Sequence, residues 1–208
     1  MRLIIGDSPL KTLEKPARAD ALHPDLARTL RGLIARTRPR NIVETGTSDG
    51  LGATLALCEA LVGNAISLDQ FYSIEFNPAA YALACEHLAE RSFQPHLLCG
   101  ICLPQTAGSH QPEPDHTIPA PVDDLLGYVL RAFEGAPDLV LLDAGSPKAL
   151  AELAYALSLI RARCYIVLKN FPGLHCPCLA SLQSDLRLQI LELSHEKLGF
   201  CIAQFDPA

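Results

Sequence analysis

Short apolar runs and helical repeats alternate along most of the chain. The apolar runs, bounded by turn residues, are typical of buried parallel strands and lie at 41–47, 71–77, 96–103, 138–144 and 164–171. Apolar residues at three- and four-residue spacing predict helices at 24–37, 50–63, 78–88, 122–134 and 148–162. Two last strands are expected at 188–194 and 200–205. This alternation predicts a doubly wound α/β sheet.

Two stretches do not fit this alternation. Residues 1–23 have little periodicity and are predicted to form an N-terminal arm, so that 24–208 make a single domain. Residues 104–121 are polar and carry several prolines, which interrupt regular structure. We expect this proline-rich loop to be either a mobile lid over a site or a disordered insertion.

Composition narrows the class of protein. The chain has 208 residues, of which 49% are hydrophobic, enough for one domain with a sizeable core. A formal charge of −6 argues against a groove for nucleic-acid phosphates. No apolar run is long enough to cross a bilayer, and the first residues form too short a run for a signal peptide, so we expect a cytoplasmic protein. The eight cysteines are then expected to be reduced thiols.

A glycine-rich turn follows the first predicted strand. It reads Glu44-x-Gly46-x-x-x-Gly50, and a helix is expected to begin near Gly50. Glycines let the backbone turn and approach a ligand, while the N–H groups of the new helix point at the turn. The spacing is not the Gly-x-Gly-x-x-Gly of dinucleotide sites. The alternative is a turn that only packs a helix on a strand.

A second acid stands in register with this turn. Glu75 ends the second predicted strand, where nucleotide-binding α/β folds place an acid that holds the ribose hydroxyls. Two acids beside one glycine turn are more specific than the turn alone.

These two segments resemble motifs I and II of the class I S-adenosylmethionine-dependent methyltransferases. The resemblance implies a Rossmann-like sheet of seven strands in the order 3-2-1-4-5-7-6, the seventh antiparallel, with helices on both faces. It implies S-adenosylmethionine as cofactor, with Glu75 on the ribose. The methionine side of the cofactor would be held by Glu44, Gly46, Thr47, Ser48 and Gly50.

The ends of the fourth and fifth predicted strands resemble those of the small cation-dependent O-methyltransferases. Asp143 and Asn170 match two positions of their metal site, but Gly145 and Lys169 stand where that family has acids. A divalent cation needs several oxygen ligands, and an ammonium would repel it, so no metal site is predicted. We expect Lys169 to take the cation's place and pair with Asp143, either in catalysis or as a plain salt bridge.

Two cysteine spacings, Cys99-Gly-Ile-Cys102 and His175-Cys176-Pro-Cys178, were weighed as zinc ligands. In the expected order the third and fifth strands lie roughly 19 Å apart, at about 4.8 Å per strand. Zinc–sulfur bonds of about 2.3 Å cannot bridge that gap. Core or surface thiols are therefore favoured, and a metal or redox role of the second spacing, predicted to lie on a loop, stays open.

We therefore predict an S-adenosylmethionine-dependent methyltransferase that methylates a small-molecule oxygen without a divalent metal. Asp143, Lys169 and Asn170 are the candidate catalytic residues. The expected partner is a small-molecule acceptor, with a homodimer left open and no nucleic acid or membrane. Two alternatives remain: a non-catalytic binding or scaffold protein of the same fold, and an oxidoreductase that uses a nicotinamide dinucleotide.

Overall fold

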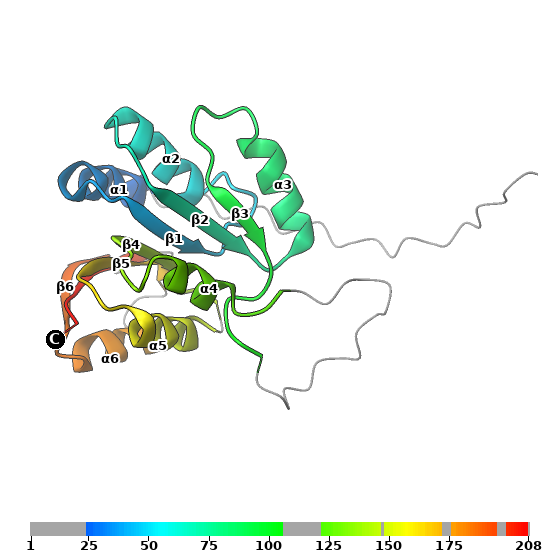
Figure 1. Ribbon diagram of the computed structural model, residues 1–208. Helices are drawn as coiled ribbons and strands as arrows, with labels where there is room; N and C mark the ends of the chain where they lie inside the picture. The colour runs from blue at the N-terminus through cyan, green and yellow to red at the C-terminus, as the bar shows by residue number, and fades with distance from the viewer. Residues whose placement is uncertain (1–23, 106–121, 147, 172–175, 195–198, 208) are drawn as a thin grey trace, which may run out of the picture.

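The structure, a computed structural model, describes residues 24–105, 122–146, 148–171, 176–194 and 199–207 (Figure 1). The predicted N-terminal arm, most of the proline-rich loop and His175 lie outside these residues. None of the helices in the described part of the chain is long and apolar enough to cross a membrane.

Seven strands form one sheet in the order β3-β2-β1-β4-β5-β7-β6. β7 runs antiparallel to both of its neighbours, and the other neighbouring pairs are parallel. The predicted strand order and the antiparallel seventh strand are confirmed. The strands are β1 (Asn41–Thr45), β2 (Gln70–Glu75), β3 (His96–Cys99), β4 (Leu139–Asp143), β5 (Cys164–Phe171), β6 (Leu188–Leu193) and β7 (Gly199–Phe205).

Helices cover both faces of the sheet, as predicted (Figure 1). One face carries α1 (Pro24–Thr37), α2 (Ala53–Gly63) and α3 (Pro78–Leu88). The other face carries α4 (Leu125–Ala132), α5 (Ala149–Leu159) and α6 (Pro177–Ser184).

The sheet separates two apolar cores. Neighbouring residues on a strand point to opposite faces, so Ile42 of β1 packs in the core beneath α1 and α2, whereas Val43 packs in the core beneath α4 and α5. Both side chains are fully buried. Strands buried on both faces carry apolar residues in succession, which explains why the parallel strands appeared as continuous runs in the sequence.

The helix after the glycine turn begins later than predicted. α2 begins at Ala53 rather than near Gly50, because residues 46–52 are used in the turn itself. Leu51, expected on the buried face of this helix, is 45% exposed. The helical spacing of the apolar residues continued into the turn and gave no sign of where the helix begins.

α6 was missed in the sequence. Residues 176–178 were expected on a loop, but Pro177 occupies the first turn of a helix, a position that suits a residue without an N–H group. Cys176, Cys178 and Leu182 are buried in the core beneath α5 and α6. Because α6 spans only eight residues, its periodic signal is short.

Candidate functional site at the carboxyl edge of the sheet

The carboxyl ends of β1, β2, β4 and β5 meet at one edge of the sheet. The winding reverses between β1 and β4, which is the position where ligands bind in open α/β sheets. Thr45 lies beside Ile74 at this edge, and Asp143 lies beside Lys169. The fold therefore brings the residues predicted to bind the methyl donor and those predicted to face the methyl acceptor to one edge of the sheet.

The glycine turn depends on both of its glycines. Gly46 and Gly50 have φ values of +71° and +80°, in the region that side chains disfavour. A Cβ atom on Gly46 would lie 3.1 Å from the Asp143 carboxylate, and one on Gly50 would lie 3.1 Å from the Leu88 side chain of α3. The turn is thus packed between β4 and α3.

Glu44 is fully buried and held by three side chains. Lys169 Nζ lies 3.0 Å from Oε1, while Oε2 accepts hydrogen bonds from Thr54 at 2.7 Å and Ser73 at 2.8 Å. Lys169 Nζ also donates to the carbonyl oxygen of Gly46. The ammonium group of this β5 residue therefore contacts both Glu44 near the end of β1 and the backbone of the glycine turn. Lys169 thus holds the turn against the sheet.

The predicted pairing of Lys169 with Asp143 is wrong. The Asp143 carboxylate is half-buried, and it accepts hydrogen bonds from Gly145 N at 3.0 Å and Asn170 Nδ2 at 3.2 Å. The fully buried Glu44 has a greater need of a counter-charge than a carboxylate that faces water. The long lysine side chain reaches past the end of β4 to meet it.

Glu75 lies where it was predicted, at the end of β2, but it is only 4% exposed. Its carboxylate accepts hydrogen bonds from the backbone N–H groups of Ser48 at 2.7 Å and Asn77 at 2.8 Å. The Thr47 hydroxyl lies 2.6 Å from that of Ser73 on the same strand. The glycine turn is therefore tied to β2 through Thr47 and Ser48.

Three polar residues near this edge were missed in the sequence. His87 Nδ1 donates to the carbonyl oxygen of Asp49 at 2.8 Å and so joins α3 to the glycine turn. Thr45 donates to Glu152 at 3.1 Å in the buried interior. Glu152 was recognisable as an acid on the apolar face of the predicted helix, between Ala149, Leu153 and Ala156.

The residues at this edge do not suit a hard divalent cation. Asp143 supplies one carboxylate and Asn170 one amide, Gly145 has no side chain, and Lys169 brings a positive charge. Such a cation takes six or more oxygen ligands, or one or two carboxylates with substrate phosphates. No group of three or more His, Cys, Asp or Glu residues within the described ranges is arranged to hold a metal ion.

All eight cysteines are free thiols, and six of them are buried. Burial raises the pKa of Cys58, Cys164 and Cys201 to about 12. Burial likewise raises the pKa of Cys178 to about 12, and its neighbour Cys176 adds to the effect. Thiols of this kind stay protonated near neutral pH, so their sulfur atoms are poor nucleophiles and poor metal ligands.

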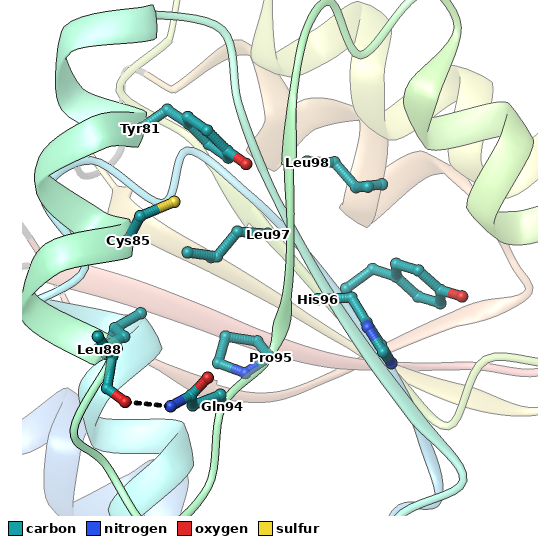
Figure 2. A pocket seen from close by; sticks show the side chains of 10 residues that line it. Tyr81, Cys85, Leu88, Gln94, Pro95, His96, Leu97 and Leu98 are labelled. Carbon is teal, nitrogen blue, oxygen red and sulfur yellow. Dashed lines mark hydrogen bonds between the residues drawn. The ribbon is translucent and has the colours of Figure 1, made fainter.

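A separate pocket of about 490 Å³ lies between α3 and β3. Figure 2 shows Tyr81 and Cys85 projecting from α3 toward Leu97. Its lining also includes Gln94 and Pro95, which precede β3, but not Glu44, Glu75, Asp143 or Lys169. It is therefore distinct from the candidate site.

No protein-family model and no curated protein sequence matches the chain. Solved structures do. An O-methyltransferase from Bacillus cereus in complex with SAH has a TM-score of 0.61 at 16% identity, over 90% of this chain and 84% of that chain. The O-methyltransferase TomG from Streptomyces achromogenes, involved in tomaymycin synthesis and in complex with SAM, has a TM-score of 0.61 at 17% identity, over 90% and 82%.

A methyltransferase from Geobacter sulfurreducens has a TM-score of 0.63 at 14% identity, over 89% of this chain and 82% of that chain. At such low identity the likeness concerns the fold. Together with the strand order and the site at the carboxyl edge, it shows that this chain has the Rossmann-like fold of the SAM-dependent O-methyltransferases.

Proposed function

We propose that the protein is an S-adenosylmethionine-dependent methyltransferase that acts on a small-molecule oxygen without a divalent metal. The observation that carries the proposal is the glycine turn tied to Glu75 at the point where the sheet reverses its winding. The O-methyltransferases from Bacillus cereus and Streptomyces achromogenes, which have the same fold, were solved in complex with SAH and SAM, and this supports S-adenosylmethionine as the methyl donor.

The donor is expected to lie across the ends of β1 and β2. Glu75 uses one hydrogen bond on each oxygen, and a carboxylate has further lone pairs that can accept the two ribose hydroxyls. Phe76, the next residue, is 71% exposed, and we propose that its ring stacks on the adenine. Gly46 and Gly50, with Thr47 and Ser48 between them, would face the methionine part.

For Glu44 we propose a different role from the one that the sequence predicted. Its carboxylate is fully buried and occupied by three partners, so we propose that it supports the turn instead of touching the donor. The shape of the turn depends on that support, because Lys169 links the same carboxylate to the carbonyl of Gly46.

S-adenosylmethionine, when bound, supplies a methyl group already activated by a positive sulfur. The protein then needs to align the acceptor and accommodate its proton. Asp143 and Asn170 lie on the acceptor side of the turn, joined by a hydrogen bond of 3.2 Å. We propose that Asp143 orients the acceptor hydroxyl and takes its proton, and that Asn170 fixes the Asp143 carboxylate.

The position of Lys169 supports the proposed metal independence. The residue is 5% exposed, and its ammonium is held by Glu44 and the Gly46 carbonyl. A positive charge is thus built into the edge and stabilises the turn. We place the enzyme in the cytoplasm with a small-molecule acceptor and no nucleic acid; a second copy of the chain as partner stays a prediction.

Calorimetric titration with S-adenosylmethionine and with S-adenosylhomocysteine tests the proposal, each with magnesium and with a chelator. We expect binding that is unchanged by the chelator and is lost in Glu75→Ala. Glu86→Ala, on the exposed side of α3, is the matched control and should bind normally. Binding that needs magnesium would contradict the metal-free mechanism.

One observation favours the non-catalytic alternative. Glu44 and Glu75 are 0% and 4% exposed, and both already have partners within the protein. A scaffold protein with this fold would keep such a closed edge. Absence of binding to both ligands, in a protein shown to be folded, would favour the scaffold over the enzyme.

A further inference from the structure

A second acid, Glu152, lies beneath the carboxyl edge on the opposite face of the sheet from Glu44. It belongs to the first turn of α5 and is 6% exposed. The Thr45 hydroxyl donates to its Oε2 atom at 3.1 Å. The same hydroxyl accepts a hydrogen bond of 3.4 Å from the backbone N–H group of Asp143. Glu152 is therefore joined to Asp143 through one hydroxyl group.

Glu44 and Glu152 have different electrostatic surroundings. Glu44 forms an ion pair with Lys169, whereas no ion pair of Glu152 with a lysine or arginine is found among the described residues. A buried carboxyl group without a cation is more stable in its neutral form.

We propose that Glu152 is a positioning residue of the site, which as a neutral carboxylic acid holds Thr45 and, through it, the Asp143 end of β4. The proposal rests on the proposed function, since Asp143 is the residue assigned there to the acceptor. The neutral acid keeps a carbonyl oxygen free to accept the Thr45 hydrogen bond, and it adds no second negative charge beside Asp143.

The groups that face Glu152 come from several elements. They are Asp143 at the end of β4, Cys102 before α4, Lys148 at the start of α5 and Cys178 in α6. Burial raises the pKa of the Glu152 carboxyl; the Thr45 hydrogen bond opposes this shift, and the charge of Asp143 reinforces it. Lys148 is exposed to water, which screens its opposing charge.

The first experiment compares Glu152→Gln with Glu152→Met. Glutamine keeps the oxygen that accepts from Thr45 and methionine does not, so hydrogen exchange of the Asp143 amide should stay slow in the former and become about tenfold faster in the latter. Thr45→Val should reproduce the effect of Glu152→Met, and Glu86→Gln is the control. Equal exchange in both Glu152 variants would overturn the positioning role.

The second experiment tests the neutral form without any ligand. The unfolded carboxyl has a pKa of about 4.3, so wild type should lose stability relative to Glu152→Gln as pH rises from there through the raised folded pKa. Chemical unfolding of both proteins between pH 4 and pH 9 measures this difference. A difference that does not change with pH would overturn the neutral acid. Because exchange and unfolding need no donor, failure of the proposed function would be seen separately, as absence of binding in wild type.

Discussion

At the residue scale, the acids that end β1 and β2 are stabilised in different ways. Glu44 faces a lysine ammonium in a site closed to water, and Glu75 accepts two backbone N–H groups. Removal of one partner from a buried ion pair leaves an uncompensated charge, which costs more than the pair contributes. The two acids therefore predict different outcomes for mutation.

Lys169→Met should be strongly destabilising, because it leaves the Glu44 carboxylate buried without a counter-charge. We expect a loss of about 3 kcal/mol in the free energy of unfolding. Glu44→Gln combined with Lys169→Met should recover much of it, since the amide oxygen still accepts from Thr54 and Ser73. Urea unfolding measures both. A single variant as stable as wild type would mean that the pair is not buried in solution.

Phe76→Ala should weaken donor binding without changing stability. The ring is 71% exposed, so its removal uncovers little of the core. The loss of stacking on a base is worth about 1–3 kcal/mol, or roughly a 5- to 150-fold increase in Kd. Calorimetry with S-adenosylhomocysteine checks this, and Tyr128→Ala, another exposed aromatic residue in α4, is the control. Unchanged affinity would remove Phe76 from the donor site.

At the element scale, the sequence predicted the strands and most helices because their burial follows regular periods. It failed where a short segment departs from the period. The start of α2 was placed too early since Leu51 continues the apolar spacing. α6 was missed since it spans only eight residues and Cys176, Pro177 and Cys178 at its start were expected on a loop. The partner of Lys169 could not be predicted either, because the choice between Glu44 and Asp143 depends on which carboxylate is more deeply buried in the folded protein.

Gly50→Ala should destabilise the strand-turn-helix unit. Gly50 has a φ of +80°, and a Cβ atom there would press on Leu88 and Ala84 of α3. We expect a loss of about 1–3 kcal/mol from backbone strain and overpacking. Gly63→Ala, at the end of α2 with open space around its Cα, is the matched control and should be neutral or slightly stabilising. Thermal unfolding of both variants measures the difference, and equal losses would contradict the packing argument.

At the scale of the whole molecule, the sheet divides the protein into a half with α1–α3 and a half with α4–α6, and the candidate site lies along their common edge. Free thiols occur in the cores of both halves. Because burial raises the pKa of these thiols, the free energy of unfolding of the whole protein should decrease at alkaline pH.

We expect stability to fall as pH rises above about 8.5, the ordinary pKa of an unfolded thiol. The folded thiols keep their protons until about pH 12 whereas the unfolded ones lose them, so proton release favours unfolding across this range. Unfolding at pH 7.5 and pH 9.5 measures the loss, which should shrink in Cys164→Ala.

In the folded protein at pH 8, a thiol reagent should react first with the half-buried Cys85 and Cys99. Rapid reaction of all eight thiols would contradict their burial.

Where β5 ends, its register with β7 shifts between Leu168 and Phe171, so that Lys169 and Asn170 form an irregularity on that side. Asn170 has a φ of +54° there. On the other side, Lys169 still pairs with β4. A bulge of this kind inserts one extra residue into the strand, bends it and changes the direction of the side chains there. An acid at position 169 would face the buried Glu44 carboxylate without a counter-charge, so redesigning this bulge into a metal-binding one would require a neutral residue at position 44 as well.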